Sequence, residues 1–269
     1  MSSFRRPSRL VAACVLALLP AAAAAQARGD TWVFRASGFF PQIDTQARVD
    51  GTGGRLGTTI DFETDVGLDD SKALPVLDMT WRFFPSHRVQ LSYLDLSRSA
   101  TSVLRTQINF GDQTYDVNTT VAGEFDSTVA ALTYLYSFHR TPETELSAGI
   151  GFFFTDIKAG LSAVGSSISR SGSVSAKAPL PVLAFNASQR FTPSISGDLR
   201  YQWFGIKIDE YDGSLNVFNA VLTWFPWKNI GFEGGYNYTR YDLGVDKENW
   251  RGEAKYTFKG PTLGIVASF

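Results

Sequence analysis

Apolar and polar residues alternate with a period of two along most of the chain. Between Leu146 and Thr155, for example, every second side chain is apolar and the intervening positions are mostly Gly, Ser or Thr. A period of two is typical of a β-strand with two different faces, whereas a helix repeats every 3.6 residues. The apolar faces are rich in Phe, Tyr and Trp, as in strands that face lipid. The pattern recurs in the segments 32–40, 77–83, 132–138, 146–155, 183–188, 198–203, 218–224, 230–239 and 250–269.

Connections of two kinds set the strand count. Short turns with aromatic flanks are typical of the periplasmic rim of a membrane barrel, and longer polar loops are typical of its extracellular side. Short turns that contain proline lie at 85–87, 141–144, 192–194 and 226–229. Together with two periplasmic termini, they predict an all-β fold, a transmembrane antiparallel up-and-down β-barrel of about ten strands. Eight or twelve strands remain open, because the long connections 41–73 and 99–123 have room for hairpins, one of them at 109–115.

The last predicted strand ends at Phe269 and needs a break to keep one apolar face. Apolar side chains occupy odd positions in residues 262–269 but even positions in residues 250–258. A bulge at Gly260-Pro261 would restore a single face, because Pro cannot donate to the ladder and Gly tolerates the bend. This interpretation places the charged residues of 251–259 in the lumen. The weakest alternation lies in the segment 89–96, where two leucines fall on the predicted polar face.

The first 27 residues have the features of a secretory signal peptide. Three arginines precede the apolar run 10–25, which ends in Ala25-Gln26-Ala27. The run is shorter than the roughly 20 residues that a membrane-spanning helix needs. We therefore expect cleavage after Ala27 and a single barrel domain over residues 28–269. The mature chain then lacks Cys14, and with it any disulfide or thiol chemistry.

Composition and motifs exclude several functions. Removing three of the 25 basic residues with the signal peptide leaves 22 against 26 acidic ones, a net charge of about −4. This balance gives no reason to expect nucleic-acid binding. No phosphate-binding glycine loop and no Cys/His cluster occurs, so we expect no cofactor and no metal. The acidic segments 61–70 and 209–213 lack the regular spacing of a calcium loop, and we interpret them as solvated surface.

Both signs of charge occur on the predicted inward faces. Barrels of about eight strands are filled by their own side chains, whereas open porins need about 16–18 strands. Buried charges are costly unless they are paired. We therefore expect an ion-pair network that fills the lumen, with a small gated or constricted channel as the alternative. The predicted network comprises Arg35, Asp78, Arg82, Asp198, Arg200, Glu233, Glu253 and Lys255.

The two histidines argue against an enzyme. Lipid-modifying and proteolytic barrels of outer membranes depend on a histidine near the outer leaflet or the extracellular rim. His87 and His139 instead adjoin predicted periplasmic turns. No carboxylate pair is placed distinctively enough to serve as general acid and base. We expect no catalytic residue and no enzymatic activity.

The segment from Ile60 to Ser97 resembles a family of uncharacterised proteobacterial outer-membrane β-barrel proteins. The resemblance rests on residues 60–68, 81–83 and 87–93. The alternating final strand that ends in Phe269 also resembles the signal by which such proteins are recognised for insertion. These resemblances imply a barrel in the outer membrane, in contact with its lipid and lipopolysaccharide and with the barrel-assembly machinery. They imply no activity and assign no functional residue.

The sequence thus favours a non-enzymatic outer-membrane barrel with a structural or surface-exposed role, with a narrow or gated path for small solutes as an option. One alternative is a lipid-modifying or proteolytic barrel enzyme. Another is an adhesin that acts through its long extracellular loops. The sequence leaves open the oligomeric state and the identity of any solute.

Overall fold

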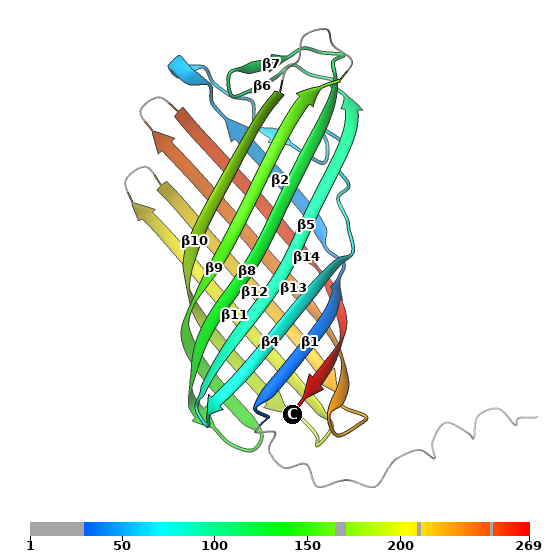
Figure 1. Ribbon diagram of the computed structural model, residues 1–269, viewed down its shortest axis with the longest axis vertical. Coiled ribbons are helices and arrows are strands. Elements are labelled where there is room, and N and C mark those ends of the chain that lie inside the picture. The colour runs from blue at the N-terminus through cyan, green and yellow to red at the C-terminus, as the bar shows by residue number, and fades with distance from the viewer. Residues whose placement is uncertain (1–29, 165–170, 209–210, 248–249) are drawn as a thin grey trace, which may run out of the picture.

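The computed structural model describes residues 30–164, 171–208, 211–247 and 250–269, and the predicted signal peptide lies outside the described residues. Nearly all of the described chain is β-strand (Figure 1). Among the described residues, no helix is long and apolar enough to cross a membrane. The elements are β1 (Trp32–Phe39), β2 (Gln42–Val49), the 3₁₀ turn η1 (Thr52–Gly54), β3 (Ile60–Asp61), β4 (Leu74–Phe84), β5 (His87–Val103), β6 (Ile108–Phe110), β7 (Gln113–Tyr115), β8 (Thr120–Arg140), β9 (Thr144–Ala163), β10 (Ser171–Arg190), β11 (Ile195–Ile208), β12 (Tyr211–Trp224), β13 (Ile230–Lys247) and β14 (Trp250–Ser268).

The sheet closes on itself through β1, which pairs with both β4 and β14. β14 pairs with two strands in succession, with β1 through residues 262–268 and with β2 through residues 252–259. β1 and β2 are therefore two parts of one barrel strand that is interrupted at Phe40-Pro41. With this pair counted once, the strands β4, β5 and β8 to β14 complete a closed antiparallel barrel of ten strands, which confirms the prediction.

Both ends of the described barrel lie at the same end of the molecule (Figure 1). The backbone N–H of Trp32 donates to the carbonyl of Phe269 at 3.0 Å. The short connections of the β4–β5, β8–β9, β10–β11 and β12–β13 hairpins lie there too, as predicted, and we call this end the turn end. The opposite end, the loop end, carries the β6–β7 hairpin, which confirms the hairpin predicted at 109–115.

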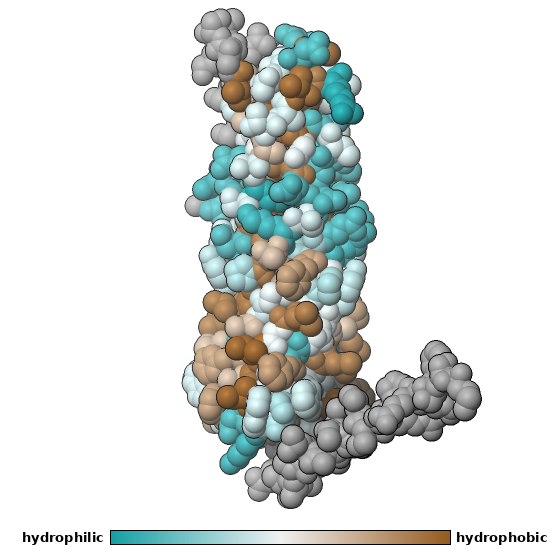
Figure 2. All heavy atoms as spheres, turned by 90° about the vertical axis from the view of Figure 1, so that its right-hand side faces the viewer, coloured by the Kyte–Doolittle hydropathy of each residue, from teal (hydrophilic) through white to brown (hydrophobic). Residues whose placement is uncertain are grey.

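Barrel strands keep the same alternate side chains inward along their whole length, but the polarity of the two faces exchanges midway. In β1 the inward side chains include Arg35 and the outward ones Phe34. In β2, the continuation of the same strand, Ile43 faces inward and Asp44 faces outward. We call the part with an apolar exterior the turn-side half and the part with an apolar interior the loop-side half. Figure 2 shows hydrophobic side chains gathered over the first and hydrophilic ones over much of the second.

The exchange occurs at matching positions on neighbouring strands. In β5, β8 and β9 it falls at Leu94, Val129 and Thr155, which are register partners of one another. The weak alternation of the segment 89–96 has this cause, because its second half lies beyond the exchange. The inward Leu94 and Leu96 belong to the apolar interior of the loop-side half.

The bulge predicted at Gly260-Pro261 is wrong. β14 pairs with β13 through these residues without any register shift. Even-numbered side chains face inward on both sides of them, from Tyr256 to Ser268. The apolar residues change parity because inside and outside exchange polarity there, so no extra residue is needed. Glycine is required at 260 for a different reason, since a Cβ atom would lie 2.3 Å from the carbonyl oxygen of Phe40.

Candidate functional site: the lumen

Four residues of the predicted network form two ion pairs inside the turn-side half. Arg35 Nε donates to Glu233 Oε2 at 3.1 Å, and Ser37 Oγ donates to the other oxygen of that carboxylate at 2.6 Å. Arg200 Nη1 lies 3.7 Å from Asp78 Oδ1. All four charged side chains are mostly shielded from solvent. Pairing offsets the cost of placing these charges in a narrow lumen.

A second cluster, nearer the turn end, centres on Glu145. Arg82 Nη2 donates to this carboxylate at 2.8 Å, and Arg88 Nη1 lies 3.2 Å from it. Arg88 Nη2 also donates to Ser147 Oγ at 2.9 Å. The sequence predicts Arg82 but misses Arg88 and Glu145, because both adjoin turns. Arg88 lies two residues before Gln90, on the polar face of the same strand, and this spacing could have identified Arg88 as a lumen residue.

The prediction that Glu253 and Lys255 belong to the lumen network is wrong. Both side chains are exposed on the outer face of β14, whereas the neighbouring Tyr256 points inward. They lie beyond the polarity exchange, where charged residues face outward. Asp198 does face the lumen, where it accepts a hydrogen bond from Ser188 Oγ at 2.6 Å.

The lumen contains two cavities, one in the turn-side half and one at its border with the loop-side half. The first measures about 160 Å³, reaches the turn end, and includes Arg88 and Arg190 in its lining. The second measures about 140 Å³ and lies deeper, against the apolar interior of the loop-side half. Arg35 and Arg200 line both cavities, so the layer of paired charges separates them.

Residues 60–73, which we call the plug segment, fold into the loop-side half. The side chains of Ile60, Phe62 and Val66 are 0% exposed. The interpretation of residues 61–70 as a solvated surface segment is therefore wrong, because the segment is anchored inside the barrel by its apolar side chains. Its apolar residues alternate irregularly with the acidic ones and occupy the barrel interior, while acidic side chains such as Asp69 stay exposed.

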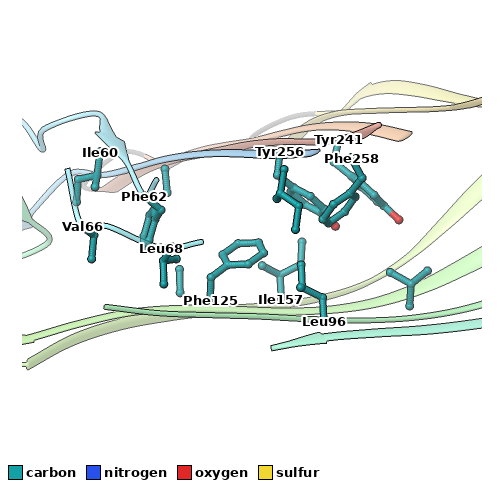
Figure 3. Close-up of a cluster of buried hydrophobic side chains, with 14 of the residues drawn as sticks. Ile60, Phe62, Val66, Leu68, Leu96, Phe125, Ile157, Tyr241, Tyr256 and Phe258 are labelled. Atoms are coloured by element: carbon teal, nitrogen blue, oxygen red, sulfur yellow. The ribbon is translucent and has the colours of Figure 1, made fainter. Parts of the chain in front are cut away.

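Aromatic rings continue the plug across the lumen (Figure 3). The ring of Phe62 lies 6.2 Å from that of Phe125, which lies 5.7 Å from the ring of Tyr256. Tyr256 stacks on Tyr241 at 4.3 Å and meets Phe258 edge-on at 5.1 Å. The three distances of 5.1–6.2 Å are within the range of favourable aromatic contacts, about 4.5–7 Å, and the tyrosine stack is slightly closer. The loop-side lumen is thus filled by an apolar core instead of the predicted ion pairs.

Arg98 of β5 holds the plug segment in place through an ion pair and hydrogen bonds. Its side chain is 2% exposed, and its Nη1 lies 2.5 Å from Glu63 Oε1 and 2.8 Å from the carbonyl of Asp69. Its Nη2 donates to Thr45 Oγ1 at 2.5 Å, and the guanidinium lies 5.3 Å from the ring centre of Phe125. One buried cation therefore connects β5, β2 and the plug segment.

The barrel wall is incomplete between β2 and β5 in the loop-side half. β4 begins only at Leu74, so within the described chain residues 95–103 of β5 have a strand partner on the β8 side alone. The plug segment fills the gap and bonds through its backbone to β2. These bonds run from Phe62 N–H to Thr45 O (3.0 Å) and from Ile43 N–H to Asp70 O (2.7 Å). Its contacts with β5 come from side chains, namely those of Arg98 and of Lys72, which donates to the carbonyl of Ser97. A seam without backbone pairing thus runs along β5.

Both histidines lie at the turn end, as predicted. His87 Nδ1 is 2.6 Å from the hydroxyl oxygen of Tyr134, and its ring lies 5.3 Å from that of Tyr136. These tyrosines belong to the exposed outer face of β8. His139 is exposed near the β8–β9 turn. Neither histidine lines either lumen cavity.

Asp50 anchors the loop that follows β2. Arg48 Nε and the backbone N–H of Gly57 both donate to its carboxylate at 2.8 Å. Burial raises the pKa of Asp50, but these hydrogen bonds and the charge of Arg48 together hold the pKa below its ordinary value of 3.8. Across the described part of the chain, no three residues of His, Cys, Asp or Glu are grouped to hold a metal ion.

No family model and no curated protein matches the sequence. Solved structures that are similar include the outer membrane protease OmpT from Escherichia coli, which is 12% identical with a TM-score of 0.49, covering 88% of this chain and 97% of that one. The attachment invasion locus protein Ail of Yersinia pestis is 14% identical with a TM-score of 0.33, covering 87% and 99%. The toluene transporter TodX of Pseudomonas putida is 7% identical with a TM-score of 0.32, covering 89% and 90%. At these values, none of the similarities assigns an activity, a ligand or a partner to this chain.

Proposed function

We propose that this chain is a non-enzymatic β-barrel of a bacterial outer membrane that crosses the membrane with its turn-side half and projects its loop-side half from the cell surface. The exchange of polarity between the two halves carries the proposal. The outward face of β9 is apolar from Leu146 to Phe154, about nine residues, which matches the about 9–11 that a tilted strand needs to cross. Further along the same face come Asp156 and Lys158, which suit water and not lipid.

Exposed aromatic side chains support this placement. Trp81, Trp224 and Trp227 are exposed near the turn end, and Tyr93 and Trp203 are exposed near the other border of the apolar face. Trp and Tyr are enriched at both interfaces of a membrane because one part of the ring is apolar and the other polar. Short turns are typical of the periplasmic side, so both termini would be periplasmic, with the outer face in contact with lipid and lipopolysaccharide.

Single cysteines in the mature chain, which otherwise lacks cysteine, test the placement. In intact cells, a membrane-impermeant maleimide should label Lys255→Cys, which lies on the outer face of the loop-side half. It should leave Leu263→Cys, on the same face of β14 in the turn-side half, unlabelled in intact and in broken cells, because lipid covers that position. It should leave Ser194→Cys, in a turn, unlabelled until the cells are broken. Labelling of Ser194→Cys in intact cells would show that the turns face the outside of the cell, opposite to the proposed topology.

We also propose that the lumen is closed to free ion flow. The plug segment and the rings around Phe125 fill the loop-side half, and paired charges cross the turn-side half. The seam along β5 supports a second candidate, a gated path that opens when the plug segment withdraws. In that case the bonds of Arg98 would have to break, because they connect β5 to the plug segment.

A reversible disulfide separates these two candidates. A Cβ atom at position 123 would lie 3.4 Å from Val66 Cβ, close to the roughly 3.8 Å of a disulfide. The Gly123→Cys/Val66→Cys protein should therefore lock the plug segment to β8 when oxidised. In a planar bilayer, a permanently closed barrel stays silent in both redox states, whereas a gated path gives current steps only after reduction. Val66→Cys alone, which leaves Gly123 in place and cannot form the disulfide, is the matched control, and steady current through the locked barrel would contradict closure.

We also propose that the barrel has no enzymatic activity, because both histidines lie at the turn end and outside the lumen. Lipopolysaccharide and a mixture of peptides should remain unchanged by mass spectrometry after incubation with the refolded barrel. A product that disappears in the His87→Ala or His139→Ala variant would establish the enzyme alternative. The adhesin alternative loses support, since Ile60, Phe62, Val66 and Leu68 of the longest predicted loop are buried in the barrel.

A further inference from the structure

The deeper lumen cavity differs from the rest of the lumen in having one polar and one apolar side. Its apolar lining comes from the loop-side core and includes Phe153, Tyr241 and Phe258. Its polar lining includes Arg35 and Arg200, whose charges are already paired with Glu233 and Asp78. The cavity is therefore amphipathic and close to neutral.

Asn219 of β12 contributes a buried hydrogen-bond acceptor to the cavity lining. The residue lines the cavity, and its amide oxygen Oδ1 is buried with no hydrogen-bond partner in the described part of the chain. Most buried polar atoms have a partner, so an exception calls for an explanation. A donor group on a molecule in the cavity would supply the missing hydrogen bond.

Size and charge narrow the class of molecule. The cavity measures about 140 Å³, and a dry apolar cavity of about 150 Å³ is large enough for benzene. A ligand with its own charge would disturb the paired arginines or remain unpaired in a buried site, which is costly. A single ring therefore fits against the aromatic side, with one neutral hydroxyl group toward the polar side.

We propose that the deeper lumen cavity binds a small, neutral, phenol-like molecule, with its ring against Phe153 and Phe258 and its hydroxyl group donating to the amide oxygen of Asn219. Entry would come from the turn end, because the first cavity adjoins the same arginine pair and the plug segment fills the other end. The site is formed with the plug segment in place, so it goes beyond the proposed closure and does not depend on it.

Fluorine NMR of 4-fluorophenol with the refolded barrel in detergent micelles tests the proposal. The signal should broaden or shift saturably with wild-type protein. Ala131→Phe would fill the cavity, since Ala131 faces inward and lines it, and should abolish the effect. Ala130→Phe, on the outer face of the same strand, should retain it and so controls for partition into micelles. Where Ala131→Phe does not give a folded barrel, Val217→Phe fills the same cavity.

The hydroxyl contact is tested separately. Asn219→Leu should weaken 4-fluorophenol binding about tenfold, the value of one good neutral hydrogen bond. It should not weaken fluorobenzene binding, and Asn216→Leu, on the outer face of the same strand, should change neither. Equal binding of 4-fluorophenol by the wild-type and cavity-filled proteins would overturn the site. Tighter binding of fluorobenzene or 4-fluorobenzoate than of 4-fluorophenol would overturn the proposed ligand class.

Discussion

The turn-side and loop-side halves of the barrel use the same strands with opposite polarity. The turn-side half has charged pairs such as Arg35–Glu233 inside and residues such as Ile265 outside. The loop-side half has Phe125 and Tyr256 inside and charges such as Lys255 outside. With the proposed membrane placement, lipid serves as the apolar phase around the first. In the second, the protein builds its own apolar core, as a water-soluble barrel does.

The comparison shows that an alternating strand carries no fixed assignment of its faces. The inward face can be polar or apolar, provided that the apolar side chains lie where water is absent. Substitutions at equivalent positions in the two halves should therefore have opposite consequences, and the following predictions run from the largest expected effect to the smallest.

Truncating the core of the loop-side half should have the largest effect. Phe125 is 2% exposed and contacts both Phe62 and Tyr256. Phe125→Ala should lower the free energy of unfolding by about 3–5 kcal/mol, because it leaves a cavity in a packed core. Urea unfolding of the refolded protein in phospholipid vesicles measures this change. The adjacent outward Glu124→Ala is the control and should cost under about 0.5 kcal/mol, and a similar loss for both would deny the apolar core.

A charge on the outer face should be costly in one half alone. Ile265 is 56% exposed on the outer face of β14 in the turn-side half. Ile265→Arg should destabilise the inserted barrel by about 2–4 kcal/mol, the value for an arginine near the membrane midplane. Thr257→Arg, on the same face of β14 in the loop-side half, should have almost no effect. Equal unfolding energies for the two variants in vesicles would remove the proposed membrane boundary.

Crowding the plug should have a smaller and more local effect. A Cβ atom on Gly123 would lie 2.1 Å from Val66 Cγ1, so Gly123→Ala must displace the plug segment. We expect a loss of about 1–3 kcal/mol, as for other overpacked cores. Amide exchange should quicken first in residues 62–68. Gly160→Ala is the control, because its Cβ would have no neighbour nearer than 3.9 Å. Faster amide exchange that occurs only in the turn-side half would contradict the contact between Gly123 and the plug segment.

Acidification should have the smallest effect, on the loop after β2. The folded-state pKa of Asp50 lies below its ordinary value of 3.8, so its ionised form stabilises the loop above that pH. The stabilisation should disappear as the pH falls below 3.8 and through the folded-state pKa. The protection of the Gly57 amide from exchange, corrected for the intrinsic rate, should fall over that range. Asp50→Asn should show no such pH dependence, and a wild-type protection factor that is constant down to pH about 2 would contradict it.

Several features of the fold follow from the sequence alone. Period-two alternation determined the strands, because only a strand separates neighbouring side chains onto opposite faces. Short turns with proline determined the number of barrel strands and the common end of the two termini. On the segments nearest those turns, the pattern also identified Arg35, Asp78, Arg200 and Glu233 as lumen residues, and the structure pairs them.

The tertiary structure alone decided which face points inward beyond the middle of each strand. Sequence reasoning assigned Glu253 and Lys255 to the lumen because it took the apolar face as the outer one throughout. That rule holds only where lipid surrounds the barrel. In the loop-side half, β4 does not extend beside β5, and the plug segment folds into that gap and supplies an apolar interior. Both depend on contacts between residues distant in sequence, such as Arg98 with Glu63, which no local periodicity contains.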